Sequence, residues 1–493
     1  MYCPSLKEFL ILSKQGNVIP VYKEINADLD TPASAFLKIK KNEYAFLLES
    51  VEGQEKIARY SFLGSNPALV FKSKSNNIEI IDMRNKSIRR FKTTSGPLNE
   101  IKTLMQDFRP VSVKGLPRFY GGFVGYMGYD VVRFFEKIPD KNPDDLKLPD
   151  SIFILTDTIL IFDHVNHTIK IVTNIILPKG INTANKIVYY RNALLRITQI
   201  QNDFKRPLKD KKIFTIEKVR KINITSNFTK SQFQDIVNKA KVYIRKGDII
   251  QVVLSQRFKT RINKGHFDIY RNLRSLNPSP YMFFLRLKDI TLIGASPEML
   301  VRCESGLVQT RPIAGTRPRG RTEEEDKKLM QQLLNDKKEK AEHIMLVDLG
   351  RNDLGRVCRT GKIEVGEFMV VEKYSHVMHM VTEIKGLLNT RYDIFDVLRA
   401  CFPAGTVSGS PKIRAMEIID ELETVKRGPY AGCVGYFSFS HNLDTCITIR
   451  TIVVKGDYAY VQAGAGIVAD SIPRKEYLET VNKAKALIEA IVR

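Results

Sequence analysis

The sequence predicts an α+β fold in which antiparallel sheets carry helices on their outer faces. Before residue 200, LPDSIFILTDTIL and IFDHVNHTIKIVTNI look like successive strands, the second pair joined by a turn at residues 164–167. After residue 228, TKSQFQDIVNKAKVYIRKGD has apolar residues at helical spacing and Gly247 as a stop, and the strand-like DIIQVVLSQRF follows. Two further segments, DKKEKAEHIMLVDLGRND and SIPRKEYLETVNKAKALIEA, read as amphipathic helices.

The length of 493 residues is compatible with two or three domains or with one interleaved unit. The polar stretch at residues 201–228 is the predicted linker between an N-terminal region (1–200) and a C-terminal region (229–493). The phrases GGFVGY (121–126) and AGCVGY (431–436) echo each other, but six residues do not establish a duplication.

Composition indicates a globular intracellular protein. Hydrophobic residues make up 43% of the chain, and no run of about 18 apolar residues suggests a membrane span. The start, MYCPSLKEFL, lacks a signal-peptide pattern, and the six cysteines are scattered without a CxxC pair, which argues against structural zinc. We therefore expect the cytoplasm, or the plastid stroma if the chain is organelle-encoded.

The formal charge of +24 leaves two interpretations. One is a basic nucleic-acid-binding protein, and the other is an ordinary lysine-rich surface. Basic residues are spread from Lys7 to Lys485, and the densest stretch, residues 205–222, has few aromatic residues for base stacking. This distribution favours the ordinary surface, so we expect neither a nucleic-acid partner nor a membrane.

Two ExxE pairs stand on the two amphipathic segments: Glu339 with Glu342, and Glu476 with Glu479. A spacing of three puts both carboxylates of a pair on one helix face. Four carboxylates from two helices are suited to Mg²⁺, which takes oxygen ligands. Neighbouring lysines are equally typical of solvated Glu/Lys faces, and spacing alone leaves both interpretations open.

The stretch PIAGTRPRG places Gly315 and Thr316 among Arg311, Arg317 and Arg319, a set suited to holding an anion, beside the inert methyl of Ala314. In AGTVSGSPK, Ser410 is a candidate helix N-cap, which serves either an anion or only the helix.

Three other stretches permit a ligand-binding role. The glycines in QAGAG allow a ligand close to the backbone or form a bulge. Arg450, inside an apolar strand-like run, must be edge-exposed, paired or facing a ligand. His376 and His379 would point to opposite faces of a strand, and we expect His376 to be structural.

Together, PIAGTRPRG, DLGRNDLGR, SHVMH, FPAGTVSGSPK, GPYAGCVGYF and QAGAGIVADS closely resemble the chorismate-utilising enzymes, above all the family of anthranilate synthase large subunits. The resemblance runs from about residue 225 to the end and continues in LLESVEGQEKIARYSFLG (47–64). It implies two interleaved halves of antiparallel sheets. It also implies a lyase that converts chorismate and ammonia to anthranilate and pyruvate, in the first step of tryptophan biosynthesis.

The same resemblance implies residue roles. Mg²⁺ would bind directly to Glu342 and Glu479, and through water to Glu339 and Glu476. The implied chorismate contacts are Gly315, Thr316, Tyr430, Arg450, Gly464, Ala465 and Gly466, with Arg450 and Tyr430 on the pyruvyl carboxylate.

Glu298 matches the acid that protonates the leaving hydroxyl, provided that burial raises its pKa. His379 matches the active-site histidine that handles a proton in the elimination. Relatives that form aminodeoxychorismate carry lysine at the position of Ala314, and relatives that add water carry lysine at the position of Gln251. The absence of both amines suits ammonia as the nucleophile.

The resemblance further implies feedback inhibition by tryptophan, bound by Ser50, Pro280, Tyr281 and Met282. No glutaminase-type nucleophilic cysteine is recognisable, so ammonia is expected from solution or from a separate glutamine amidotransferase subunit in a hetero-oligomer. Two alternatives remain: aminodeoxychorismate synthase component I of the folate pathway, and the basic nucleic-acid-binding protein.

Overall fold

Two large antiparallel sheets face each other in the computed structural model, which describes residues 1–39, 43–50, 59–208, 223–374 and 377–493. Within these residues the first sheet has thirteen strands: β1 (Tyr2–Cys3), β2 (Val18–Asn26), β11 (Thr168–Ile176), β10 (Thr158–Asp163), β4 (Tyr60–Ser65), β3 (Tyr44–Glu49), β14 (Tyr281–Leu287), β15 (Ile290–Ser296), β26 (Thr451–Lys455), β27 (Tyr458–Ile467), β13 (Gln251–Arg261) and β12 (Thr225–Ser226), with β23 (Gly409–Ser410) also paired to β13.

The second sheet has eleven strands in the described chain: β19 (Cys358–Val365), β22 (Ile384–Leu388), β17 (Leu307–Thr310), β16 (Met299–Glu304), β25 (Leu443–Ile447), β24 (Cys433–Ser438), β8 (Gly122–Met127), β9 (Ser151–Thr156), β5 (Leu69–Lys74), β6 (Asn77–Asp82) and β7 (Ile88–Lys92). A small third sheet consists of β18 (Ile313–Pro318), β21 (Val377–Val381) and β20 (Val370–Lys373).

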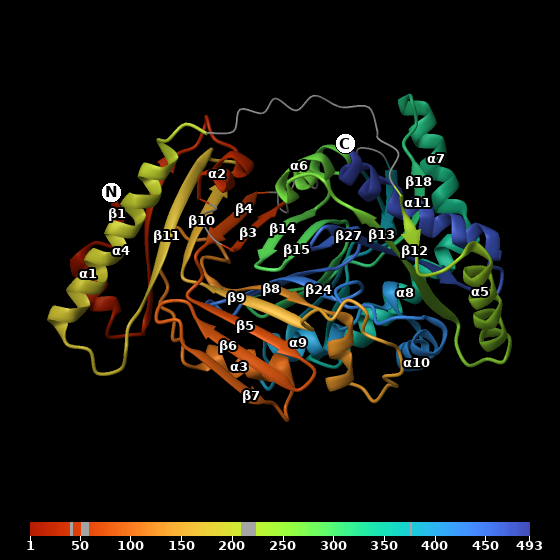
Figure 1. Ribbon diagram of the computed structural model, residues 1–493, viewed down its shortest axis with the longest axis horizontal. Coiled ribbons are helices and arrows are strands. Elements are labelled where there is room, and N and C mark those ends of the chain that lie inside the picture. The colour runs from red at the N-terminus through yellow and green to blue at the C-terminus, as the bar shows by residue number, and fades with distance from the viewer. Residues whose placement is uncertain (40–42, 51–58, 209–222, 375–376) are drawn as a thin grey trace.

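Helices cover the outer faces of the sheets, with α1 and α4 at one end of the molecule and α5, α7 and α11 at the other (Figure 1). In chain order the helices are α1 (Leu6–Leu12), α2 (Pro32–Ile39), α3 (Pro97–Gln106), the 3₁₀-helix η1 (Tyr129–Phe134), α4 (Thr183–Phe204), α5 (Lys230–Arg245), α6 (His266–Leu276), α7 (Glu323–Asn335), α8 (Lys337–Gly355), α9 (Ile394–Cys401), the 3₁₀-helix η2 (Gly405–Val407), α10 (Lys412–Leu422) and α11 (Pro473–Val492). The predicted α+β class is confirmed.

The core follows from the alternation of side chains along each strand. In β3, Phe46 enters the apolar core between the two large sheets, whereas Ala45 and Leu47 enter a second core under the helices that cover the first sheet. In β14, Phe283 and Phe284 divide in the same way. The first sheet is therefore buried on both faces.

Both large sheets contain strands from both ends of the chain. β3 pairs with β14 in the first sheet, and β8 pairs with β24 in the second. The two echoing phrases of the sequence lie in β8 and β24, where Gly125 is the direct partner of Gly435. Helix α4 continues to Phe204, and residues 209–222 of the proposed linker lie outside the described residues. The boundaries at 200 and 228 stay a prediction.

The chain passes between the two large sheets at several short segments. It leaves the first sheet after β15 and enters the second at β16 through Pro297 and Glu298. It returns between β25 and β26 through residues 448–450. Arg450 therefore lies between strands, with a φ of 50°, and the sequence-based placement inside one strand was wrong. Likewise β9 and β10, separated only by Asp157, belong to different sheets.

The sequence predicted the position of helix α5 correctly but not the way in which helix α10 begins. The predicted helix at this position is confirmed as α5, which begins after Thr229, and the Thr229 side chain forms a capping box with Gln232. Helix α10 instead begins after Pro411, which offers no side-chain cap, because the backbone of Ser410 pairs with Gln251 of β13. The predicted N-cap role of Ser410 was wrong.

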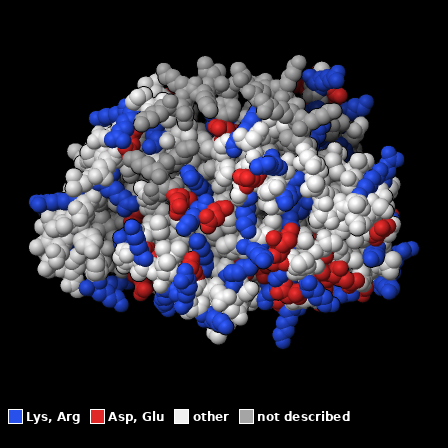
Figure 2. Space-filling view, viewed as in Figure 1, with Lys and Arg blue, Asp and Glu red and all other residues white. Residues whose placement is uncertain are grey.

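Two further features concern membrane spans and surface charge. None of the helices in the described part of the chain is long and apolar enough to cross a bilayer. On the face shown in Figure 2, Lys and Arg side chains are interspersed with Asp and Glu.

Candidate active site

A cavity of about 720 Å³ lies between α8, α11, the small third sheet and the segments that pass between the two large sheets. It is lined by thirteen of the fourteen residues proposed for catalysis, metal or chorismate: Gln251, Glu298, Gly315, Thr316, Glu339, Glu342, His379, Tyr430, Arg450, Gly464, Gly466, Glu476 and Glu479. Residues more than 200 positions apart thus meet at one site.

Ala465 is the exception. Gly464 and Gly466 face the cavity from β27, and Ala465 between them points to the opposite face, into an apolar cluster under α5 and α10. The sequence left a bulge open at these glycines, but β27 pairs with β13 without a register shift and continues to Ile467. Any contact of Ala465 with a ligand is therefore limited to its backbone.

The two carboxylate pairs come from two helices, as their spacing predicted. Helix α8 presents Glu339 and Glu342, and α11 presents Glu476 and Glu479. Burial, with a contribution from the charges of Glu339 and Glu479, raises the pKa of Glu342. The carboxylates of the two helices thus line one cavity, where their negative charges add to the effect of burial.

Each of three carboxylates has a partner within the protein. The side-chain amide of Gln251 donates to Glu342 at 2.9 Å, and Lys483 forms an ion pair with Glu479 at 2.7 Å. Arg317 pairs with Glu339 at 3.2 Å. The two cationic partners, Lys483 and Arg317, offset part of the negative charge on the two helices.

These donors suit a magnesium ion that keeps water and substrate ligands. Among the described residues, no three His, Cys, Asp or Glu side chains form a group that could hold a metal by themselves. A cage of four carboxylates is therefore not formed. Mg²⁺ commonly binds one or two carboxylates together with waters and substrate oxygens, and Glu342 and Glu479 fit that pattern.

Arg450 and Tyr430 form a second polar wall. The left-handed backbone of Arg450 directs one guanidinium nitrogen to the carbonyl oxygen of Lys483 at 3.1 Å, which leaves further N–H groups for a ligand. Burial raises the pKa of Tyr430 to about 12, so its hydroxyl is a donor at neutral pH. A Cβ at Gly464 would lie 2.6 Å from that hydroxyl, which explains the glycine.

His379 is held in one tautomer. Its Nδ1 lies 3.2 Å from the carbonyl oxygen of Gly315, which can only accept, so Nδ1 carries the proton and Nε2 is left as the acceptor. Nδ1 also lies 3.0 Å from the hydroxyl of Thr316. Burial lowers the pKa of His379, and the ring is therefore neutral at pH 7. His376 lies outside the described residues.

Glu298 lies where the chain passes from β15 to β16, and it is only 7% exposed. Burial raises the pKa of its carboxyl to about 8, with the side chain of Thr406 and the charge of Lys483 opposing the rise only in part. Glu298 thus keeps its proton at neutral pH, the condition that the sequence-based assignment of an acid required.

The PIAGTRPRG stretch contains β18, which pairs with β21. Ala314 lines the cavity, and Gly315 after it is bulged, with a φ of 67° that disfavours any other residue. The three neighbouring arginines do not form the expected anion cradle. Each one pairs with a carboxylate: Arg311 with Glu372, Arg317 with Asp336 and Glu339, and Arg319 with Asp326.

Sequence reasoning missed several polar residues of the cavity wall, among them Lys483, Gln462 and Thr406. Lys483 follows Glu479 by one helical turn, and Gln462 precedes Gly464 by one strand period, so both could have been found from spacing. Thr406 lies in the quoted AGTVSGSPK motif, where only the later serine was considered.

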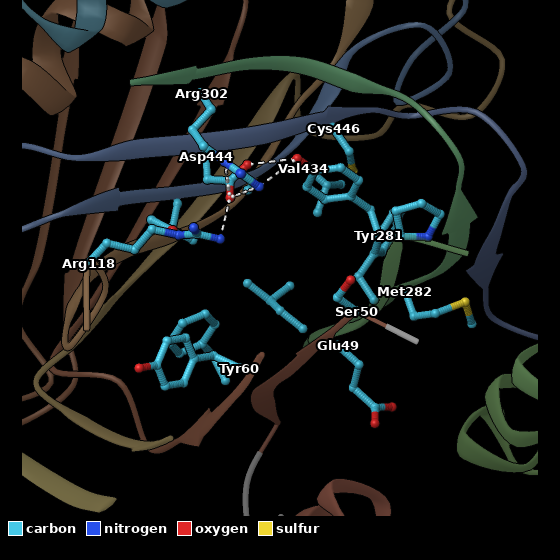
Figure 3. Close-up of a pocket in the computed structure, with 16 residues that line it drawn as sticks. Glu49, Ser50, Tyr60, Arg118, Tyr281, Met282, Arg302, Val434, Asp444 and Cys446 are labelled. Atoms are coloured by element: carbon cyan, nitrogen blue, oxygen red, sulfur yellow. Dashed lines mark hydrogen bonds and ion pairs between the residues drawn. The ribbon is translucent and has the colours of Figure 1, made fainter. Parts of the chain in front are cut away.

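A second pocket gathers the residues proposed for tryptophan (Figure 3). Ser50, Pro280, Tyr281 and Met282 line it at the junction of β3 with β14. The Tyr281 hydroxyl donates to Asp444 at 3.0 Å, and Asp444 also pairs with Arg302 at 2.9 Å and Arg118 at 3.2 Å. Leu48 contributes to the lining, whereas Leu47 is buried in the core. Residues 51–58 of the LLES segment lie outside the described residues.

The sequence pattern of the chorismate binding enzymes matches residues 43–489. The chain belongs to this family and is a chorismate-utilising enzyme. Among individual proteins, it is 51% identical over 495 residues to anthranilate synthase component 1 of Acetivibrio thermocellus, with 100% of this chain and 99% of that protein covered.

The similarity extends to another bacterium and to a crystal structure. The chain is 51% identical over 500 residues to anthranilate synthase component 1 of Aquifex aeolicus, with 99% of this chain and 97% of that protein covered. The crystal structure of anthranilate synthase component I from Streptococcus pneumoniae matches with a TM-score of 0.78 and 37% identity, covering 94% of this chain and 98% of that one.

Proposed function

We propose that this chain is the synthase subunit of an anthranilate synthase, which converts chorismate and ammonia to anthranilate and pyruvate. The observation that supports this most is the convergence of Glu342, Glu479 and Arg450 on one cavity. Chorismate is a dicarboxylate. A divalent cation on the two carboxylates and the guanidinium of Arg450 in the same cavity provide a separate cationic partner for each end of such a substrate.

In this proposal Arg450 and Tyr430 bind the pyruvyl carboxylate, and Gly315, Thr316 and β27 contact the substrate along the cavity wall. Glu342 and Glu479 hold Mg²⁺ directly, with Glu339 and Glu476 acting through water. When bound there, Mg²⁺ would withdraw electron density from the ring carboxylate and stabilise negative charge that develops on the ring.

Ammonia forms a bond to C2 of the ring as the C4 hydroxyl departs. Glu298, protonated at neutral pH, donates the proton with which that hydroxyl leaves as water. In the second step the bond between the ring and the enolpyruvyl oxygen breaks, the ring loses its C2 proton to become aromatic, and the released enolpyruvate takes up a proton to give pyruvate. The free Nε2 of neutral His379 suits the base that accepts the C2 proton.

Two neutral side chains support ammonia as the nucleophile. Ala314 offers no amine that could attack the ring, and the side-chain amide of Gln251 cannot act as the base that would activate water. Both features disfavour the alternative aminodeoxychorismate synthase and the water-adding relatives. Ammonia would come from a separate glutamine amidotransferase subunit, and tryptophan bound at Ser50, Pro280, Tyr281 and Met282 would inhibit turnover.

The direct test is to incubate the pure chain with chorismate, MgCl₂ and ammonium sulfate and to follow anthranilate fluorescence and released pyruvate. Equal amounts of the two products support the proposal. An amino-chorismate product would replace it with aminodeoxychorismate synthase. Salt-sensitive binding to nucleic acid without turnover would replace it with the basic binding protein.

The metal assignment has its own test. Glu479→Gln should lower turnover at least about 100-fold and abolish the heat of Mg²⁺ binding in calorimetry, because a direct ligand is lost. Glu489→Gln is the matched control, since Glu489 lies on the same helix but pairs with Arg493. Unchanged Mg²⁺ binding in Glu479→Gln would contradict the assignment.

A further inference from the structure

A buried ion pair lies behind the residues that line the cavity. Arg427 and Glu423 follow the end of α10, and their side chains are 1% and 2% exposed. Two hydrogen bonds join them, from Nε of Arg427 at 2.9 Å and from Nη2 at 2.5 Å. Neither residue lines the cavity, and neither was singled out by the sequence.

The guanidinium of Arg427 ties two segments of the cavity wall to each other. It donates to the carbonyl oxygen of Val407 in η2 and to that of Val253 in β13, both at 2.7 Å. Val407 and Val253 line the cavity. One rigid fork therefore fixes the spacing between two elements that are about 150 residues apart in the chain.

Arg427 also lies against the ring of Tyr430. Its central guanidinium carbon is 5.5 Å from the ring centroid of Tyr430 and 4.9 Å from that of Tyr129, within the range of cation–π contacts. Burial raises the pKa of Tyr430, and the positive charge of Arg427 opposes that rise. The arginine thus holds the ring in place and strengthens the phenol as a hydrogen-bond donor.

Glu423 extends the contact to another wall residue. Its carboxylate accepts from the backbone N–H of Ser255 at 2.9 Å and from the Ser255 hydroxyl at 2.8 Å. The side-chain amide of Gln462, which lines the cavity, donates to that hydroxyl at 2.8 Å. The ion pair therefore contacts Val407, Val253 and Tyr430 of the cavity wall directly, and it is connected to Gln462 through Ser255.

We propose that Arg427, oriented by Glu423, is a positioning residue that sets the placement of Tyr430 for binding of the substrate carboxylate. A buried ion pair contributes little net stability compared with well-packed apolar residues, because two charges must be desolvated. A role in specifying the geometry of the cavity accounts for the pair better than a role in stability. This inference rests on the proposed function only in naming chorismate as the ligand.

The test compares Arg427→Lys with the wild type. Lysine keeps the charge but loses the fork, so the KM for chorismate should rise about 10-fold or more while kcat changes less than about 3-fold, since binding of ground state and transition state weakens together. Glu423→Gln, which keeps the shape of the pair, should shift KM in the same direction by less. Wild-type KM in Arg427→Lys would overturn the proposal.

A double-mutant cycle separates positioning from a purely structural role. If Arg427 acts through Tyr430, the loss of chorismate affinity caused by Arg427→Lys should largely disappear in the Tyr430→Phe background. An equal loss in both backgrounds would overturn the proposal. Affinity is measured by calorimetry with chorismate alone, so the cycle remains informative even if the wild type makes no anthranilate and the proposed function fails.

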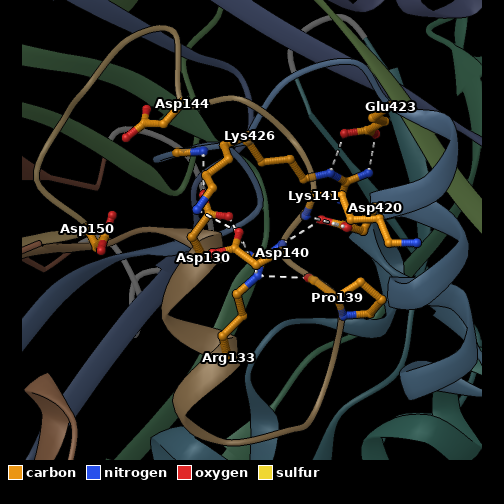
Figure 4. Close-up of polar contacts among 12 residues, drawn as sticks. Asp130, Arg133, Pro139, Asp140, Lys141, Asp144, Asp150, Asp420, Glu423 and Lys426 are labelled. Atoms are coloured by element: carbon orange, nitrogen blue, oxygen red, sulfur yellow. Dashed lines mark hydrogen bonds and ion pairs between the residues drawn. The ribbon is translucent and has the colours of Figure 1, made fainter. Parts of the chain in front are cut away.

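Arg133→Lys is the matched control. Arg133 lies in the neighbouring polar cluster, where it pairs with Asp420 at 2.6 Å and with Asp130 (Figure 4). These partners lie outside the cavity wall. Arg133→Lys should lower the melting temperature without changing the affinity for chorismate. If Arg133→Lys lowers the affinity for chorismate as much as Arg427→Lys does, with a similar loss of melting temperature, the role of Arg427 is only structural.

Discussion

At the scale of single residues, Glu298 combines two properties that a proton donor needs. Its carboxyl is buried, and its pKa is about 8, so it is protonated at neutral pH but close enough to that pH to release the proton. The place of the residue in the short connection between two sheets accounts for the burial.

The pH dependence of turnover should report this group. We expect kcat to fall as pH rises through about 8, because the protonated carboxyl is the active form. Glu298→Gln should lower kcat about 100-fold or more, since an amide cannot donate a proton to the leaving hydroxyl. Initial rates from pH 6 to pH 9.5 test this, and a flat profile would contradict the assignment.

The same residue should influence stability with a defined sign. The folded state binds the Glu298 proton more tightly than the unfolded chain, whose carboxyl has an ordinary pKa of 4.5. The free energy of unfolding of the wild type relative to Glu298→Gln should therefore decrease between pH 4.5 and pH 8, by at most about 1.4 kcal/mol per pH unit. Urea unfolding at pH 5 and pH 8 measures this difference.

Ala314 offers a test of nucleophile choice. Its methyl lines the cavity, and a lysine at this position would place a primary amine next to the ring. We expect Ala314→Lys to lose anthranilate formation and to acquire the mass of chorismate less one water, because the amine displaces the C4 hydroxyl. Intact-protein mass spectrometry detects the adduct. Ala314→Met, of similar bulk, should show none, and an unmodified Ala314→Lys would count against this reading.

At the scale of elements, β27 shows how a strand can form part of a binding site. Its glycines leave space on the cavity face, and its alanine fills the opposite core. The tight fit of Tyr430 over Gly464 makes the strand sensitive to a single methyl group.

Gly464→Ala should displace the Tyr430 hydroxyl, because the added Cβ would lie 2.6 Å from it. We expect the KM for chorismate to rise about 10-fold, equivalent to about 1.4 kcal/mol. Gly355→Ala is the control: the nearest atom to its added Cβ is 3.9 Å away, and alanine is the better helix former in α8. It should keep the wild-type KM, and an equal rise in both variants would refute the steric explanation.

The individual helices and strands were more predictable from the sequence than the sheets that they join and the partners that they contact. The helices with the two ExxE pairs formed as their periodicity indicated. The change of sheet at Asp157 and the loop position of Arg450 were not predictable, because apolar runs on either side of a crossing look like one continuous strand. The anion site predicted at Arg311, Arg317 and Arg319 was wrong for a similar reason. Their carboxylate partners are 7 to 61 residues away in the sequence.

The gathering of the site could be anticipated only through resemblance. Spacing put Glu342 beside Glu339 and Glu479 beside Glu476, but it gave no distance between the two helices. Arg427 and Glu423 show the limit of motif reading, because neither touches the cavity and their contacts depend on the three-dimensional arrangement of β13, η2 and Tyr430.

At the scale of the whole molecule, the proposed regulatory pocket and the cavity are one strand apart. Tyr281 of the pocket is the direct partner of Ser296 in β15. The Ser296 hydroxyl donates to the carbonyl oxygen of Ile447 at 2.7 Å, and the Ile447 N–H donates to the carbonyl oxygen of Glu298 at 3.1 Å. A ligand that shifts β14 would therefore act on the backbone that carries Glu298.

Ser50→Ala should weaken inhibition by tryptophan about 10-fold while turnover without tryptophan changes less than about 2-fold, because Ser50 lines the proposed regulatory pocket and is not part of the cavity lining. Anthranilate formation at increasing tryptophan concentration measures both quantities. Ser73→Ala removes a buried hydroxyl pair with Ser151 in the second sheet and should leave inhibition unchanged. Equal tryptophan sensitivity in Ser50→Ala and the wild type would contradict the pocket assignment.

The pairing of β3 with β14 and of β8 with β24 has a consequence for any shortened form of the protein. Residues 229–493 contain the whole cavity lining, yet without the first part of the chain β14 and β24 would each present an unpaired, apolar edge to solvent. Such a fragment would lose the pocket at Ser50 and gain two aggregation-prone borders at the same time. The proposed regulatory pocket and the protection of the two sheet edges therefore depend on the same part of the chain, and truncation could not remove one of them while keeping the other.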